Sequence, residues 1–371
     1  MNASRYDAIV IGAGIVGTAT ARALALAGRR VFVPERGWPG GEATAAAAGM
    51  LAPQVETSPG DPLLSLGIAA RDRYAGLVAK LERDGAQELG YRARGVALVA
   101  FDEERAAELR AQVAAQRALG FEAEWLDRAA LLKRHPGIGP EALGALLAPR
   151  DGAIDNVKLA AALLASGTRA GVEFAEREEV FELLVRGGRV AGVRTSRMIR
   201  ETDTVVLAAG AWSPSIRGLP RSLRVMPARG QMALVPWPGG EPDAVLFGRH
   251  TYALRRGDDA ILGSTMEWAG FEPVTTEEGM DRIRRETGAL LPALLGQPVR
   301  KRWAGLRPMT PDGRPIIGRD PEVHGLFYAT GHGRNGILLG PLTGEIICDL
   351  VVRGDTPYDI APYSVTRFET A

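Results

Sequence analysis

The chain has 371 residues with 45 basic and 44 acidic side chains, a net charge of +1, and one cysteine. This length predicts about two domains, each able to bury a core, and one cysteine excludes an intramolecular disulfide. The balanced charge gives no broad basic field, so we expect no nucleic-acid partner and no anionic membrane surface, and small molecules as ligands.

The first predicted elements form a nucleotide-binding unit. An apolar run at residues 8–11 leads into the spacing of Gly12, Gly14 and Gly17, and a helix-compatible segment follows. A second β-branched run ends on Glu35, about 20 residues past the glycines, as a dinucleotide site requires. Such a triplet could arise by chance among 46 glycines. The strand, helix and acid in register argue for a cofactor site, and therefore for an enzyme.

Each of these residues has a physical role. Gly12 permits the tight strand-to-helix turn, Gly14 lets the backbone approach a pyrophosphate, and Gly17 lets the helix pack closely on the strand. Amides at the helix N-terminus then face the phosphates. Glu35 is placed to accept hydrogen bonds from a ribose diol, and its charge would repel a 2′-phosphate. NADP is therefore disfavoured, whereas FAD and NAD both remain possible.

A small-residue segment and a series of helices and strands follow. Residues 43–50 are nearly all small, which lets another group come close to the backbone. The patterns predict helices at about 62–84, 103–119 and 156–166, strands at 95–101, 190–194 and 204–210, and antiparallel pieces between 223 and 268. We expect the strands at 190–194 and 204–210 to return to the first sheet.

The last third of the chain carries further chemistry. Residues 303–313 predict a rigid, turn-rich loop that holds Arg307, and a strand at 325–331 leads into the glycine-rich segment 332–336. A helix is expected at 337–352. In a flavoprotein, its N-terminus would stabilise the negative charge that builds on the reduced ring.

Five segments carry a resemblance to a known family. They are the N-terminal glycine motif and residues 45–50, 227–231, 303–313 and 331–336. Together they resemble the D-amino-acid oxidase family of FAD enzymes, and within it the branch that oxidises glycine for thiamine biosynthesis. The resemblance extends nearly from end to end, and its two C-terminal segments are the most specific. It implies that a substrate amine is oxidised to an imine by hydride transfer to flavin N5, while O2 is reduced to hydrogen peroxide.

The resemblance also implies the fold class, which is α/β. A Rossmann-like FAD-binding domain would be interleaved with an α+β substrate domain built on a mostly antiparallel sheet. We expect the FAD-binding domain to consist of residues 1–88, 149–217 and 303–371, and the substrate domain of residues 89–148 and 218–302. A homo-oligomer is implied as well.

Carried over residue by residue, the resemblance implies a substrate pocket. Arg307 would anchor the substrate carboxylate, because a planar guanidinium matches a carboxylate with two charge-assisted bonds. Tyr252 would reach the same carboxylate, although a tyrosine that only packs on a sheet shows the same pattern. His250 would lie beside the pocket and Met266 would line it, unless Met266 only fills the core. Arg334 would lie near the flavin, where a structural salt bridge is an equally good interpretation.

The expected FAD contacts come from all three segments of the FAD-binding domain. They are Gly12, Gly14, Ile15, Gly17, Glu35, Arg36, Thr44, Ala45, Ala47, Gly49, Met50, Val180, Ala209, Gly210, Trp212, Gly331, His332, Gly333, Arg334, Asn335, Gly336 and Ile337. The loop at Arg307 offers no thiol and Cys348 lies in the following helix, so we expect FAD to be bound non-covalently. The four histidines show no metal-ligand spacing, and we expect no metal.

These observations favour the oxidation of a small amino acid, with glycine as the substrate, for thiazole and thiamine biosynthesis. One methylene changes binding by only about 1 to 3 kcal/mol, so a D-amino-acid or sarcosine-type oxidase or dehydrogenase is an alternative. A non-catalytic FAD-binding scaffold is the alternative from another class. We expect a cytoplasmic protein, because the N-terminus does not resemble a signal peptide, one cysteine fits a reducing compartment, and no apolar run of about 18 residues could span a bilayer.

Overall fold

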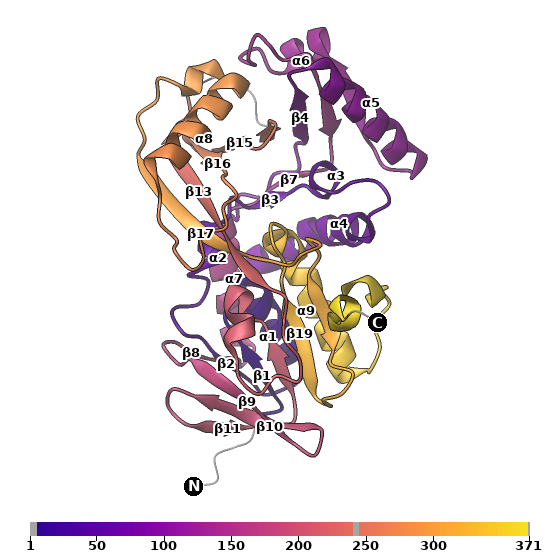
Figure 1. Cartoon of the computed structure of the whole chain (residues 1–371), viewed down its shortest axis with the longest axis vertical. Coiled ribbons are helices and arrows are strands. Elements are labelled where there is room, and N and C mark those ends of the chain that lie inside the picture. Colours follow the sequence, from indigo (N-terminus) through magenta and orange to yellow (C-terminus); the bar gives the residue numbers. More distant parts are fainter. Residues whose placement is uncertain (1–5, 240–244, 370–371) are drawn as a thin grey trace.

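A computed structural model describes residues 6–239 and 245–369 of the chain. Its two largest sheets lie toward opposite ends of an elongated molecule, one with six strands and one with eight (Figure 1). In the view of Figure 1, the six-stranded sheet occupies the lower half and the eight-stranded sheet the upper half. The architecture confirms the predicted α/β class with a second, mostly antiparallel sheet.

The six-stranded sheet contains the N-terminal motif. Its strand order is β18-β19-β12-β1-β2-β8, and its neighbours are parallel except for the antiparallel edge pair β18 and β19. The strands are β1 (Ala8–Ile11), β2 (Val31–Pro34), β8 (Glu173–Ala175), β12 (Val205–Leu207), β18 (Ile316–Arg319) and β19 (Leu326–Thr330). Segments from the beginning, middle and end of the chain therefore meet in one sheet.

Both faces of this sheet are buried, which explains the continuous apolar runs of its strands. In β1, Ala8 and Val10 face a core shared with the helices, whereas Ile9 and Ile11 face the opposite core. The helices are α1 (Ile15–Leu26), α4 (Pro62–Arg83), α7 (Asn156–Arg169) and α9 (Gly336–Val352). Helix α1 packs against both α7 and α9, so the helix that follows the glycine motif lies at the centre of its layer.

The opposite core is closed by a three-stranded antiparallel sheet in the order β11-β10-β9. Its strands are β9 (Val180–Arg186), β10 (Arg189–Thr195) and β11 (Ile199–Glu201). The expectation that residues 190–194 return to the first sheet is therefore wrong, because β10 packs on the face of that sheet. Residues 204–210 do return, since β12 pairs with β1. Both segments are short and apolar, and their patterns do not distinguish a paired strand from a stacked one.

The eight-stranded sheet has the order β17-β13-β16-β15-β14-β4-β6-β5, and its pairs are antiparallel except β14 with β4. Its strands are β4 (Val96–Ala100), β5 (Glu124–Asp127), β6 (Gly144–Ala148), β13 (Met226–Pro236), β14 (Val245–Phe247), β15 (Tyr252–Arg256), β16 (Asp259–Gly263) and β17 (Lys301–Met309). Helix α5 (Glu103–Ala118) covers one face, and α6 (Arg128–Arg134) and α8 (Glu277–Leu290) cover the other.

Short elements lie between the two large sheets (Figure 1). They are α2 (Ala43–Ala46), β3 (Met50–Leu51), α3 (Pro53–Glu56) and β7 (Gly152–Ala153). Four 3-10 helices complete the described elements, η1 (Gly210–Ser215), η2 (Pro292–Leu294), η3 (Ala361–Tyr363) and η4 (Val365–Phe368). None of the described helices is long and apolar enough to cross a membrane.

The predicted helices are confirmed at α4, α5 and α9 to within one residue, and α7 extends three residues past its expected end. Helices α4, α5 and α7 begin after the aspartates Asp61, Asp102 and Asp155, whose carboxylates accept backbone N–H bonds from the first turn. These caps are local signals, which explains the agreement.

The expected loop at 303–313 is wrong over most of its length. Residues 301–309 form β17, which pairs with β13 so that Arg307 lies opposite Ala228. Pro308 suggested a turn, but β17 is an edge strand, where a missing backbone N–H is tolerated. This strand belongs to the segment expected in the FAD-binding domain, yet it pairs within the eight-stranded sheet. The domain boundaries themselves stay a prediction.

Candidate active site

A cavity lies where the two large sheets approach each other. Its walls come from the Gly12 turn, the N-termini of α1 and α9, residues 42–50, and the strands β13, β15 and β17. Elements of the parallel sheet thus form one part of the cavity, and strands of the eight-stranded sheet form the other.

Most of the residues predicted from the sequence line this cavity. They are Gly12, Gly14, Ile15, Glu35, Arg36, Thr44, Ala47, Gly49, Met50, Val180, Ala209, Gly210, Trp212, Tyr252, Arg307, Gly331, His332, Gly333, Arg334, Gly336 and Ile337. Gly17, Ala45 and Asn335 are not lining residues, although each is next in sequence to residues that line the cavity. A Cβ atom on Gly17 would lie 1.9 Å from the Gly12 carbonyl oxygen, and Asn335 is the residue before α9.

His250 and Met266 are not among the lining residues, and both side chains are exposed. His250 lies in the turn before β15, which begins at Tyr252. The alternation of side chains along a strand therefore does not extend to His250, and its side chain is not held on the face of Tyr252. Met266 is next to Thr265, but the contact with Arg307 is made by the Thr265 carbonyl oxygen and not by the Met266 side chain. The structure therefore separates these two side chains from the other candidate residues.

The N-terminal turn is shaped for close approach of the backbone. Gly12 has φ = +98°, and a Cβ atom there would lie 2.8 Å from the carbonyl oxygen of Ala208. Glu35 is buried at 7% exposure and its two carboxylate oxygens accept N–H bonds from Ala13 and Gly37, both of 2.8 Å. A carboxylate has about four acceptor positions. Glu35 therefore keeps capacity for a ligand in the cavity.

The small-residue segment is held from behind by three side chains. Carbonyl oxygens of residues 44–48 accept hydrogen bonds from Asn156 at 2.7 Å, from Trp303 at 3.1 Å and from Arg256 at 2.6 Å. Arg256 also donates to the Asn156 side-chain oxygen at 3.0 Å. Sequence reasoning missed Arg256 and Asn156, because nothing local marks an arginine in a strand as the partner of a loop far along the chain.

Arg307 and Tyr252 extend into the other part of the cavity. The Arg307 guanidinium donates to the Thr265 carbonyl oxygen at 3.1 Å and to the Ser264 hydroxyl at 2.6 Å. No carboxylate of residues 6–239 or 245–369 lies within ion-pair distance of it, and burial lowers its pKa. Tyr252 is 5% exposed, and burial raises the pKa of its hydroxyl. Together they offer a cation and a neutral hydroxyl to an anionic ligand.

Arg334 also lines the cavity, but it has an ion-pair partner. Its guanidinium lies 3.0 Å from the carboxylate of Glu56 on α3, and this charge raises the pKa of Arg334. Sequence reasoning missed Glu56, although it too lines the cavity. His332 is buried, its Nε2 lies 3.0 Å from the Thr343 hydroxyl, and burial lowers its pKa to about 3. The imidazole is therefore neutral.

Comparison with known proteins identifies the family. Residues 7–350 match the family described as FAD dependent oxidoreductase (DAO). The chain belongs to this family. It is 34% identical to the glycine oxidase of Geobacillus kaustophilus over 98% of this chain and 97% of that protein. The crystal structure of glycine oxidase from the same organism aligns with a TM-score of 0.94 at 33% identity, covering 98% of this chain and 99% of that one.

A second relative combines two activities in its name. The chain is 34% identical to the "Bifunctional protein ThiO/ThiG" of Trichormus variabilis, with 98% of this chain and 55% of that protein covered. The similarity to glycine oxidases and to a ThiO segment agrees with the resemblance inferred from the sequence.

The cavity fits the cofactor of an FAD-dependent family. The Gly12 turn leaves no room for a side chain, and Glu35 keeps acceptor capacity for a ribose. Neither α1 nor α9 has an acidic residue in its first turn, so both positive helix ends remain available to a diphosphate or to a flavin. Among the residues that the structure describes, no group of three metal-ligating side chains comes together.

Proposed function

We propose that this protein oxidises glycine to the corresponding imine with FAD, and that the imine supplies the thiazole of thiamine. One observation carries the proposal: Arg307, a partly buried cation without a carboxylate partner among the described residues, lies beside Tyr252 in the cavity of an FAD-dependent oxidoreductase. The names of the relatives from Geobacillus kaustophilus and Trichormus variabilis, glycine oxidase and ThiO/ThiG, support glycine as the substrate and thiamine synthesis as the destination.

Arg307 and Tyr252 would hold the substrate by its carboxylate. A guanidinium has five N–H donors, and Arg307 uses two directions for Ser264 and Thr265. The remaining donors can form charge-assisted bonds with a carboxylate, while the Tyr252 hydroxyl donates a further bond. The substrate carboxylate would also give the Arg307 guanidinium a negative partner, which none of the described residues supplies. These contacts fix the substrate by its least reactive end and leave its Cα–H and amine free to react.

FAD, when bound, supplies the hydride acceptor at N5. The residues to hold it are in place: Gly12 and the N-terminus of α1 for the pyrophosphate, Glu35 for the ribose, and the N-terminus of α9 for the flavin. We propose non-covalent binding, because Cys348 lies on α9 with its sulfur against the backbone of α1 and is not a lining residue.

The electron balance defines the second substrate. Loss of a hydride from Cα and of a proton from nitrogen turns the amine into the imine. FAD would pass these two electrons on, and we propose that O2 accepts them with two protons to give hydrogen peroxide. A cytoplasmic location and a homo-oligomeric state are part of the same proposal.

Anaerobic reduction tests the function directly. Glycine added to the FAD-loaded protein without oxygen should bleach the flavin absorbance, and admission of air should restore it with release of peroxide. Bleaching by sarcosine or D-alanine but not by glycine would show that glycine is not the substrate and that one of these amines is. A normal flavin spectrum that none of these amines bleaches would refute catalysis and favour a binding scaffold.

A further inference from the structure

Glu56 is a carboxylate that lines the same cavity as the proposed substrate anchors Arg307 and Tyr252. It lies at the end of α3, its side chain is only 10% exposed, and it pairs with Arg334 at 3.0 Å. Its charge also acts on Arg307: burial lowers the pKa of the Arg307 guanidinium, and the negative charge of Glu56 opposes this effect. A carboxylate has acceptor positions beyond the one used by Arg334. Glu56 can therefore bind a donor inside the cavity.

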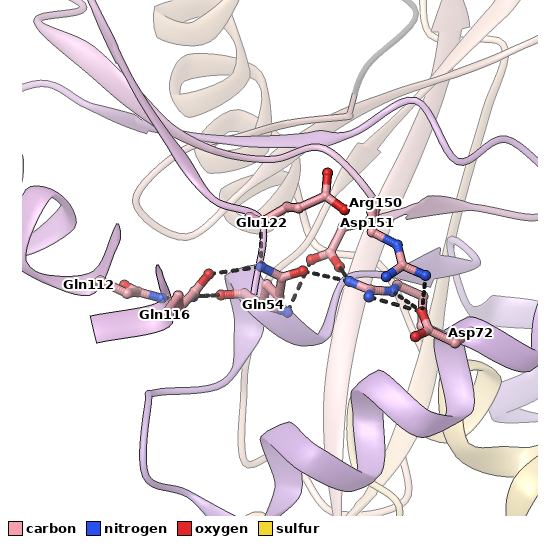
Figure 2. Close-up of polar contacts among 8 residues, drawn as sticks. Gln54, Asp72, Gln112, Gln116, Glu122, Arg150 and Asp151 are labelled. Atoms are coloured by element: carbon pink, nitrogen blue, oxygen red, sulfur yellow. Dashed lines mark hydrogen bonds and ion pairs between the residues drawn. The ribbon is translucent and has the colours of Figure 1, made fainter. Parts of the chain in front are cut away.

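A buried polar network holds the helix that carries Glu56 (Figure 2). The hub is Gln54, whose backbone N–H donates to Asp151 at 3.1 Å and whose side-chain oxygen accepts from Arg71 at 2.6 Å. Its side-chain amide donates to Gln116 at 3.0 Å, and its own carbonyl oxygen accepts from the same residue at 2.6 Å. Arg71 also bonds to Asp151 at 2.8 Å.

The residues of this network are almost completely buried. Gln54, Gln116 and Asp151 are each at most 1% exposed, and Arg71 is 3% exposed. The residues come from α3, α4, α5 and the segment before β7, so elements on both sides of the cavity fix one short helix. With its amide, carbonyl and side chain all bonded, Gln54 leaves α3 little freedom. The position of Glu56 two residues later is therefore set by the scaffold and not by a ligand.

The charges around the substrate position have a definite balance. Arg307 and Arg334 carry positive charge and Glu56 carries negative charge, which leaves one net positive charge. Tyr252 and His332 are neutral, because burial raises the pKa of the first and lowers that of the second. Glu267, the other acid that acts on Arg307, is paired with Arg229 at 2.5 Å. An amino acid with an ionised carboxylate and a neutral amine balances this charge, whereas an ammonium group would leave an unpaired charge in a buried site.

We propose that Glu56 accepts a hydrogen bond from the amino group of the substrate, and that the Glu56–Arg334 pair selects the amino acid whose amine is neutral. The inference rests on the proposed function and deepens it. It assigns the pair a role in the reaction, since only a neutral amine has the lone pair that becomes the second bond of the imine. Glu56 is a specificity residue here, and Gln54 is a positioning residue that acts through it.

Three variants of the FAD-loaded protein test the proposal, with two readouts each: the pH dependence of kcat and of kcat/KM for glycine, and the binding of acetate, followed by the flavin absorbance. Glu56→Gln removes a negative charge and should lower the maximal kcat/KM about tenfold. Acetate has no amino group, and the added positive charge attracts its carboxylate, so its affinity should not fall. Glu56→Asp keeps the charge but shortens the side chain, so kcat/KM should fall without a shift of the acid limb.

The acid limb of the kcat profile reports the amine of the bound substrate. In Glu56→Gln the extra positive charge should move it toward lower pH by about one unit, and in Arg334→Met the lost positive charge should move it toward higher pH by about one unit. Glu108→Gln, which removes the carboxylate of an exposed ion pair with Arg105 on α5, is the matched control and should match the wild type.

Two results would overturn the inference. Equal losses of glycine and acetate affinity in Glu56→Gln would show that Glu56 only supports the cavity. Acid limbs that stay in place, or shift in the same direction in Glu56→Gln and Arg334→Met, would remove the charge argument. The bleaching test on the wild-type protein distinguishes failure of this inference from failure of the proposed function. If sarcosine or D-alanine bleaches its flavin in place of glycine, the same series is measured with that amine, and if no amine does, both proposals fail.

Discussion

Replacement of Gly230 by alanine tests the position of Arg307 without touching that residue. Gly230 lies on β13 opposite Gly305 on β17, and a Cβ atom there would lie 2.0 Å from Nη1 of Arg307 and 2.4 Å from its Cζ. Ordinary contacts with a Cβ atom begin at 3.4 Å, so the guanidinium must move. A displacement of about 1 Å at a binding group can cost about 100-fold in rate, or about 2.7 kcal/mol. We expect this loss in kcat/KM for glycine, mostly through KM.

The assay is peroxide production over a range of glycine concentrations, with FAD content measured on the same preparation. Gly76→Ala is the matched control, because a Cβ atom there meets nothing within 4 Å and Gly76 lies inside α4. The control should keep the wild-type KM and gain about 0.5 to 1 kcal/mol of stability, as alanine does in a helix. A Gly230→Ala protein that binds FAD and has a KM within twofold of the wild type would refute Arg307 as the anchor.

Further predictions concern the anchor, the cofactor and stability. Arg307→Ala should lower kcat/KM for glycine by about 10³-fold, as expected when two charge-assisted bonds are lost; unchanged kinetics would contradict the assignment. Arg256→Met, which frees the backbone of residues 44–48, should weaken FAD binding about tenfold by fluorescence titration; an unchanged affinity would exclude a role in the cofactor site. Acid precipitation should release all yellow colour from the protein, whereas colour retained in the pellet would indicate a covalent bond. His135 is 1% exposed, its ring has no hydrogen-bond partner among the residues that the structure describes, and burial lowers its pKa to about 4 from the 6.5 of an exposed histidine. The unfolded chain therefore takes up a proton that the native state does not, stability falls as the pH drops through this window, and His135→Leu should remove about 2 kcal/mol of that loss at pH 5 in urea unfolding curves. Equal pH dependence in variant and wild type would contradict it.

The predictable parts of the fold are those with local causes. The glycine turn and α1 follow from the spacing of Gly12, Gly14 and Gly17, and the starts of α4, α5 and α7 follow from the aspartates that cap them. The stacked sheet of β9, β10 and β11 was not predictable in this way. Its apolar residues fit a paired strand and a packed face equally well, and only the tertiary structure decides between them.

The candidate site shows the same division. Residues 331–337 and the N-terminal turn form cavity walls next to their own segments, and the sequence predicted them. Glu56 escaped prediction because α3 has four residues, and its partner Arg334 is 278 residues away. His250 and Met266 were expected in the pocket from resemblance alone, and the ends of the strands β15 and β16 carry them outside it. Long-range contacts therefore decide which members of a motif reach the site.

Arg307 lines the cavity as predicted, although the local structure predicted around it was wrong. Gly305 and Pro308 suggested a loop, but the antiparallel pair of β13 and β17 places Arg307, Gly305 and Gly230 on one face, and that face is turned toward the cavity. Side chains alternate along a strand, so a slip of one residue in this pair would move Arg307 to the opposite face. The proposed role of Arg307 as anchor therefore depends on the register of an edge strand in the eight-stranded sheet. The two glycines leave the space that the guanidinium and the small-residue segment occupy, since a Cβ atom on Gly305 would lie 2.3 Å from the Cβ atom of Ala46. Gly230 and Gly305 thus create the space around Arg307, the proposed substrate anchor, and Gly305 is also one of the residues that made β17 hard to recognise from the sequence.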